Sequence, residues 1–127
     1  VHGLDGLDEI TITDKTKVCE LVGHTIKSYY LDPEECGIKK SKLSDLTVNT
    51  AEESAAAIRE ILEGVHSPKR DVVLVNAAAA IIAGGLANDF TEGIKIASRS
   101  IDTGNAKETL KKLMEISWQS PQERMVL

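Results

Sequence analysis

The sequence predicts an α/β fold in which a partial sheet with a β-hairpin is covered by about four helices. Three observations predict it. Segments within the first 31 residues alternate apolar and polar side chains with a period of two, which is typical of strands. After residue 49 the spacing changes to three and four, which is typical of helices. The length of 127 residues, with 42% apolar and 28% charged residues, suits one folded domain.

Strands are expected in the N-terminal part of the chain. Residues 9–13 alternate apolar and polar side chains, and so do residues 25–31. Only Gly23-His24 separates the latter from residues 17–22. Since glycine adopts the positive φ that tight hairpin turns require, an antiparallel hairpin is predicted here. Residues 32–37 resemble a short helical turn ended by a glycine, and residues 38–48 are a connector that completes the segment 1–48.

Helices are expected over residues 49–117. Three segments begin with a capping residue followed three positions later by glutamate, a pattern that pairs the free N–H groups at a helix start. These pairs are Thr50 with Glu53, Asp89 with Glu92, and Asn105 with Glu108. Glycines 64 and 104 stand where helices end.

A further helix is expected between the first two of these segments. Ser67-Pro68 is a typical helix start, and residues 71–86 are apolar on nearly every side. This helix is therefore predicted to be buried all round, at the centre of the helical layer. Residues 118–127 lack periodicity and are predicted to form a partly ordered tail.

Composition excludes several classes of function. A net charge of −5 and a pI near 5.2 oppose binding to a nucleic-acid backbone. Cys19 and Cys36 have no metal-ligand spacing, so they are interpreted as reduced packing residues of a cytoplasmic protein. The longest apolar run, residues 72–83, is interrupted by Asn76 and is too short for a membrane span.

The segment HGLDGLDE at residues 2–9 carries the candidate chemistry. Its two glycines allow tight turns after a strand, and the adjacent carboxylates of Asp8 and Glu9 follow. Mg²⁺ commonly takes one or two protein carboxylates and completes its shell with water and phosphate oxygens. The pair could therefore bind a diphosphate through Mg²⁺. The alternative is that both residues are solvated turn carboxylates, and spacing alone does not distinguish the two.

The segment VHGLDGLDEIT resembles the HGxDGLDE motif of anthranilate phosphoribosyltransferases. The resemblance continues through DPEECGI, NTAEESAAAIREIL, RDVVLVNAAAAI and EGIKIASRSIDTGNAKETLKKL. It implies that the chain is the C-terminal part of a larger α/β domain and that Asp8 and Glu9 hold Mg²⁺ beside the pyrophosphate of phosphoribosyl pyrophosphate (PRPP). It also implies transfer of phosphoribosyl from PRPP to anthranilate, a step of tryptophan biosynthesis.

Other motifs of that family are missing. Its glycine-rich phosphate loop and its anthranilate contacts would lie before residue 1, as would the N-terminal helical domain through which the parent enzyme forms a homodimer. The isolated chain is therefore expected to be inactive. Three alternatives remain: an enzyme similar to pyrimidine nucleoside phosphorylases, which share the architecture, a noncatalytic relative that binds nucleic acid, and a plain structural domain.

The remaining polar and aromatic candidates are assigned structural roles. His2 is interpreted as a hydrogen-bonding residue at a strand end, and His24 and His66 as solvated. Asn76 is expected to satisfy a buried backbone group where helix and sheet meet. Phe90 and Trp118 are interpreted as core or rim packing.

Overall fold

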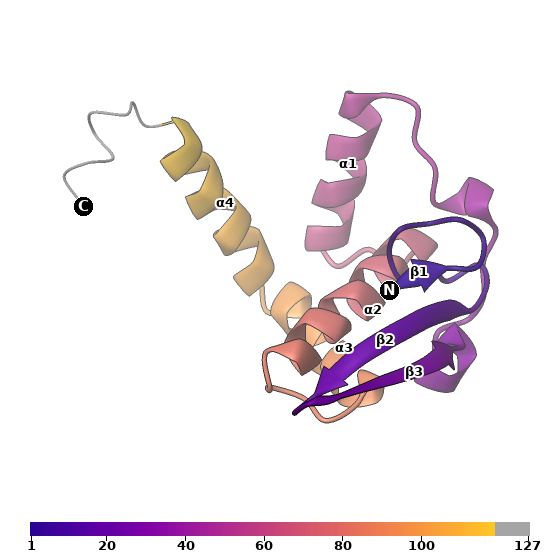
Figure 1. The fold of residues 1–127 in the computed structure, drawn as a ribbon. Coiled ribbons are helices and arrows are strands. Elements are labelled where there is room, and N and C mark those ends of the chain that lie inside the picture. Colours follow the sequence, from indigo (N-terminus) through magenta and orange to yellow (C-terminus); the bar gives the residue numbers. More distant parts are fainter. Residues whose placement is uncertain (119–127) are drawn as a thin grey trace.

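A computed structural model describes residues 1–118, and the chain forms a small antiparallel sheet with helices packed on one of its faces (Figure 1). The three strands follow one another in the order β1-β2-β3. Four α-helices come after them, which confirms the predicted fold class. The strands are β1 (His2–Gly3), β2 (Thr16–Val22) and β3 (Thr25–Leu31), and the helices are α1 (Ala51–Leu62), α2 (Pro68–Ala83), α3 (Phe90–Asp102) and α4 (Asn105–Trp118). Trp118, predicted to begin the tail, is the last residue of α4, and the remainder of the predicted tail, residues 119–127, lies outside the described residues.

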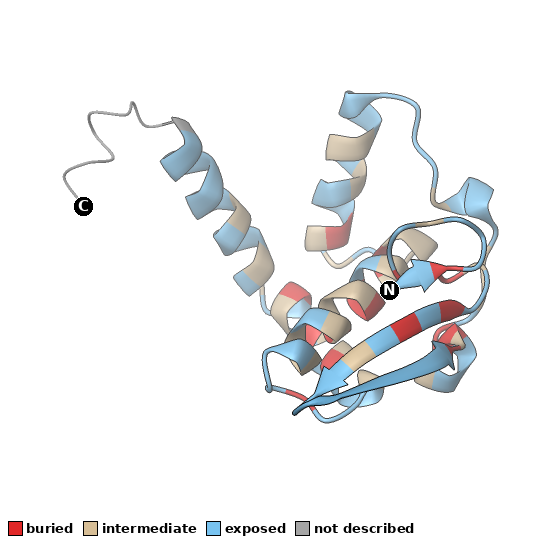
Figure 2. Cartoon of the chain, viewed as in Figure 1, coloured by how far each residue is buried: buried red, intermediate tan, exposed pale blue. Residues whose placement is uncertain are grey.

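Strands β2 and β3 form the predicted hairpin. Val22 pairs with Thr25, and the intervening Gly23 has a φ of 62°, as the tight turn requires. Val18 of β2 and Leu31 of β3 are buried against the helices, whereas most of β3 is exposed (Figure 2). The hairpin is therefore anchored along one face only, and β3 is an edge strand. No helix within residues 1–118 is long and apolar enough to cross a membrane.

The connector between the sheet and α1 contains two short 3-10 helices. The first, Pro33–Cys36, ends at Gly37 as predicted, with a φ of 77° at that glycine. The second, Leu43–Asp45, was not predicted and lies within the connector.

Two of the three predicted helix starts are capped as expected. The Thr50 hydroxyl accepts the Glu53 N–H at 3.1 Å, and the Asp89 carboxylate accepts the Glu92 N–H at 2.8 Å. In both cases the glutamate carboxylate accepts the N–H of the residue just before the cap. Each cap thus satisfies backbone donors that the helix itself leaves free.

The third predicted cap is wrong. Asn105 is already the first residue of α4, and the carbonyl of Gly104 accepts the Glu108 N–H at 3.0 Å. Gly104 also ends α3, since its N–H donates to the carbonyl of Ile101. The connection between the two helices is so short that one glycine serves both ends, which leaves Asn105 no capping role.

The core forms where β2, the segment before it, α2 and α3 meet (Figure 2). Helix α2 lies between the sheet and α3, so it contributes to both groups of buried side chains, whereas α1 and α4 extend away from this body (Figure 1). The group nearer the sheet contains Ile10, Ile12, Val18, Leu31, Ile38 and Val75. The group between the helices contains Ile61, Leu74, Ala97 and Ile101.

The expectation that α2 is buried all round is wrong. The helix begins at Pro68 after the Ser67 cap, as its sequence suggests, but Val73 is 43% exposed and Ala80 is also exposed. Leu86 follows the end of the helix and is 71% exposed. An apolar composition all round a helix predicts burial, but the described residues cover only the faces towards the sheet and α3.

Helices α2 and α3 cross in close contact at Gly93, and we expect Gly93→Ala to destabilise the protein. An alanine Cβ there would lie 2.8 Å from the Cβ of Ala78 and 3.0 Å from its Cα. The overpacking costs about 1–3 kcal/mol, against a gain of roughly 1 kcal/mol in helix propensity. Urea unfolding measures the outcome. Thr91→Ala, at an exposed position of α3, is the control, and equal or higher midpoints for both variants would contradict the expected clash.

Candidate metal centre

Residues 4–15 form the loop that carries Asp8 and Glu9, and this loop connects β1 to β2. Its base is closed by the Leu4 N–H, which donates to the carbonyl of Lys15 at 2.8 Å. The strand predicted over residues 9–13 is not formed, although Ile10 and Ile12 are buried as their alternation indicates. The alternation therefore identified the two buried isoleucines, but it predicted neither the backbone conformation nor the burial of Thr11 between them.

The backbone of this segment pairs with side chains rather than with a strand. Both polar groups of Ile10 bond to the amide of Asn76 on α2: the Ile10 N–H donates to Oδ1 at 3.0 Å, and Nδ2 donates to the Ile10 carbonyl at 2.8 Å. The next N–H, of Thr11, donates to the Thr16 hydroxyl at 3.0 Å. Buried backbone groups must be paired, and these bonds replace a sheet ladder. The role expected for Asn76 is confirmed.

Asp5 braces the loop from within. Its carboxylate accepts the Thr11 hydroxyl at 2.6 Å, the Leu7 N–H at 3.2 Å and a short hydrogen bond from the Thr13 hydroxyl. Partial burial acts to raise the pKa of Asp5, but the donated hydrogen bonds outweigh it and hold the pKa below its usual range. Asp5 is thus an ionised internal brace that joins the beginning of the loop to its end.

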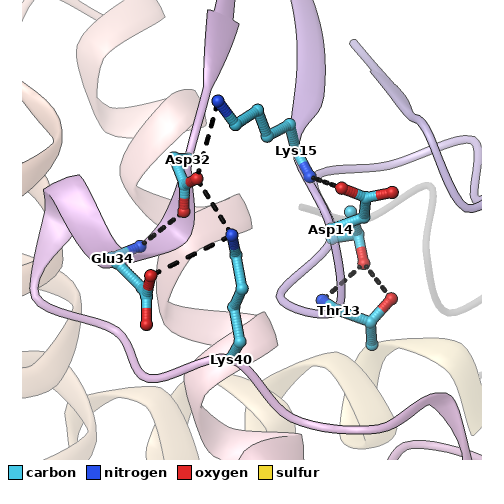
Figure 3. Close-up of polar contacts among 7 residues, drawn as sticks. Thr13, Asp14, Lys15, Asp32, Glu34 and Lys40 are labelled. Carbon is cyan, nitrogen blue, oxygen red and sulfur yellow. Dashed lines mark hydrogen bonds and ion pairs between the residues drawn. The ribbon is translucent and has the colours of Figure 1, made fainter.

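The end of the loop lies beside Asp32, the residue that follows β3. Lys40 Nζ lies 2.9 Å from a carboxylate oxygen of Asp32, and Lys15 Nζ lies 3.9 Å from the same oxygen (Figure 3). The hydrogen bond from Lys40 is the main reason that the pKa of Asp32 is lowered. One carboxylate therefore holds the last residue of the loop beside the connector after β3.

Asp8 and Glu9 are both exposed on this braced loop. Neither carboxylate makes a hydrogen bond or ion pair to another of the residues from 1 to 118, so their oxygens are available to a ligand. No group of three or more potential metal ligands occurs in that same part of the chain. Two exposed carboxylates suit a cation that takes most of its ligands from water and phosphate, and Mg²⁺ is such a cation.

The other sequence candidates do not join this pair. His24 lies exposed in the hairpin turn, as expected. His2 is exposed, and its side chain makes no hydrogen bond within the described part of the chain, so its expected structural role is wrong. His66 is not merely solvated, because its Nε2 lies 3.4 Å from a guanidinium nitrogen of Arg70. Phe90 packs partly buried against the core, as expected, and the side chain of Trp118 lies outside the described residues.

Two residues with structural roles were missed in the sequence: Asp5, which braces the loop of the site, and Arg70, which lies away from that loop. Asp5 was not singled out, although two threonines that can donate to it follow it in the chain. Arg70 was overlooked at the start of an apolar helix, where a charged residue is a signal of a buried ionic contact. Its side chain is 1% exposed and bonds to Gly64, Ser98 and Asp102, which joins α2 to α3 and to the segment that follows α1.

The chain matches a known class of transferase domain over most of its length. Residues 1–107 match the model of the glycosyl transferase family, a/b domain. The chain belongs to this family.

Within it, the chain is similar to anthranilate phosphoribosyltransferases. It is 44% identical to that of Rhodopseudomonas palustris (strain HaA2) over 92% of its own length and 35% of the relative's. It is 48% identical to that of Thermoanaerobacter sp. (strain X514) over 91% of its length and 34% of the relative's. These matches confirm the resemblance found in the sequence, and the chain spans about a third of the length of these relatives.

Solved structures of anthranilate phosphoribosyltransferases are also similar to this chain. Anthranilate phosphoribosyltransferase from Saccharomyces cerevisiae in complex with PRPP and Mg superposes with a TM-score of 0.79 at 29% identity, covering 87% of this chain and 32% of the yeast chain. The enzyme from Thermus thermophilus superposes with a TM-score of 0.76 at 31% identity, covering 85% of this chain and 32% of that one.

Proposed function

We propose that this chain is the metal-binding part of an anthranilate phosphoribosyltransferase, which transfers phosphoribosyl from PRPP to anthranilate in tryptophan biosynthesis. The observation that carries the proposal is the exposed Asp8–Glu9 pair on a braced loop, in a chain 44–48% identical to such enzymes. A yeast relative solved in complex with PRPP and Mg supports the choice of ligand.

The proposed role of the chain in the reaction is electrostatic. Asp8 and Glu9 would hold Mg²⁺ against the pyrophosphate of PRPP, and the bound cation would neutralise charge that builds on the departing group. Glycosyl transfer of this kind requires positioning and charge stabilisation rather than a nucleophilic side chain. The braces at Asp5 and Asn76 suit this role, because they fix the backbone on either side of the acidic pair.

The proposal also includes the location, the oligomeric state and the partners of the enzyme. We propose that it acts in the cytoplasm as a homodimer, through a helical domain outside these 127 residues. We do not propose nucleic acid or membrane surfaces as partners, because the chain has a net charge of −5 and would be repelled by their negative charge. The phosphate loop and the anthranilate contacts of the family are not found in this sequence, so the substrate-binding residues of the reaction are proposed to lie outside it.

The first test compares the 127-residue chain with a full-length enzyme that carries it. We expect the full-length enzyme to convert anthranilate and PRPP in the presence of Mg²⁺, and to stop when EDTA removes the cation. The 127-residue chain is expected to give no turnover, because it lacks the phosphate loop. The measurement is the loss of anthranilate fluorescence with time. Absence of turnover by the full-length enzyme, or undiminished turnover in EDTA, would show that the proposed activity is wrong. Turnover by the isolated chain would show instead that the substrate-binding residues lie within it.

A further inference from the structure

We infer that Asn76 is a positioning residue that fixes the Asp8–Glu9 pair for cation binding, although it lies on a helix 66 residues further along the chain than its partner Ile10. This inference rests on the proposed function, since it takes Asp8 and Glu9 as the metal ligands. It adds a residue whose side chain is turned to the backbone of the loop and not to the ligand.

The amide of Asn76 holds Ile10 from both sides. Its oxygen accepts the Ile10 N–H at 3.0 Å and its nitrogen donates to the Ile10 carbonyl at 2.8 Å, so a single side chain pairs the residue as a neighbouring strand would. The same nitrogen donates to the carbonyl of Val72 at 2.9 Å, one turn earlier in α2. This third bond fixes the orientation of the amide on its helix, because exchanging its oxygen and nitrogen would lose both donated hydrogen bonds.

Ile10 directly follows Glu9, so the contact acts on the backbone of the acidic pair itself. The Ile10 side chain is 1% exposed and packs in the same buried group as Val75, the neighbour of Asn76. The contact of Asn76 with Ile10 therefore joins helix α2 directly to the residue next to Glu9.

The other brace acts differently. Among residues 1–118, Asp5 bonds only to Leu7, Thr11 and Thr13, all within the loop, so it maintains the shape of the loop but does not set where the loop lies. Asn76 connects the acidic pair to the helices. Removal of this amide is expected to let the residues around Ile10 shift relative to α2, and ligands that shift bind a cation more weakly.

The test uses a full-length enzyme that carries this segment, with Asn76→Leu as the variant. Leucine has a similar shape but can neither accept from nor donate to Ile10. We expect the Mg²⁺ concentration for half-maximal turnover to rise roughly tenfold, as for other residues that orient metal ligands. Amide exchange of Ile10, measured without Mg²⁺, is expected to accelerate at least as much, since its N–H loses its acceptor.

A control separates positioning from general destabilisation. Asp102→Asn weakens the contact of Arg70 between α2 and α3, away from the loop. It is expected to lower the melting temperature while leaving the Mg²⁺ requirement within about twofold of wild type. If Asn76→Leu does not fold, Asn76→Ser is used instead. The smaller serine side chain leaves space for a water molecule that can hydrogen-bond to the backbone of Ile10.

A double-mutant cycle with Glu9→Gln completes the design. If Asn76 acts through Glu9, its effect on the Mg²⁺ requirement largely disappears in the Glu9→Gln background, while its effect on melting temperature persists. An unchanged Mg²⁺ requirement in both Asn76 variants, or the same increase in Asp102→Asn, would overturn the inference and leave the metal site standing. If Asp8→Asn and Glu9→Gln themselves leave the requirement unchanged, the proposed function is wrong and the inference is overturned with it.

Discussion

Asp8→Asn and Glu9→Gln, made separately in a full-length enzyme that carries this segment, are each expected to lower turnover at least about tenfold, or roughly 1.4 kcal/mol of barrier. Each change preserves the shape of the side chain and removes the charge that would hold Mg²⁺. Both side chains are exposed and make no hydrogen bond to another residue within 1–118, so the fold should be intact in both variants. The measurement is the initial rate against Mg²⁺ concentration at saturating anthranilate and PRPP.

The same loop provides a matched control. Asp14 is an exposed carboxylate at the end of the loop, where it accepts the N–H of Lys15 at 2.7 Å (Figure 3). Asparagine can make this bond as well, so Asp14→Asn changes the charge of the loop by the same amount without touching the proposed ligands. We expect it to retain most of the activity. Wild-type rates and Mg²⁺ dependence in the Asp8 and Glu9 variants would show that the two carboxylates are only solvated.

Arg70→Met is expected to destabilise the 127-residue chain by roughly 3 kcal/mol, the largest effect on stability among the changes considered. Methionine fills much of the space of the arginine stem, but it donates nothing to Gly64 at 3.0 Å, to Ser98 at 2.9 Å or to Asp102 at 2.7 Å. The carboxylate of Asp102 is 53% exposed and regains water, which keeps the loss below that of a fully buried pair.

Urea unfolding measures this loss, which corresponds to a lower midpoint on the order of 1.5 M. Ser98→Ala is the matched control, because it removes one of the same contacts and leaves the guanidinium with Asp102 and Gly64. It should cost clearly less than Arg70→Met. Equal midpoints for Arg70→Met and wild type would mean that the buried guanidinium is no more stabilising than an apolar side chain of its length, as in some buried ion pairs.

Local patterns predicted much of the fold. The hairpin follows from Gly23 between two alternating segments, and two helix starts follow from Thr50 and Asp89, each with a glutamate three residues later. Each of these patterns spans only a few residues, so it can be recognised from the local sequence alone. The acidic pair was likewise visible, although only its resemblance to a family motif distinguished Asp8 and Glu9 from ordinary turn residues.

Contacts distant in sequence account for what local patterns did not predict. Residues 9–13 alternate as a strand does, yet an asparagine on α2 takes the hydrogen bonds that a neighbouring strand would have taken. The third helix cap failed because Gly104 serves the ends of two helices, and a pattern of single helix starts does not include such a junction. Burial of α2 was overestimated because composition describes all faces of a helix, while packing covers only some of them.

The sequence was therefore sufficient for the fold class, the hairpin, the extent of the helices and the position of the candidate ligands, because each depends on residues close together in the chain. Tertiary structure was needed to show that Asp5 braces the loop, that Asn76 holds Ile10, and that Arg70 joins α2 to α3. Each of these polar side chains is fixed by partners that folding brings together. Buried polar groups must find such partners, but the spacing of the residues does not reveal which ones they find.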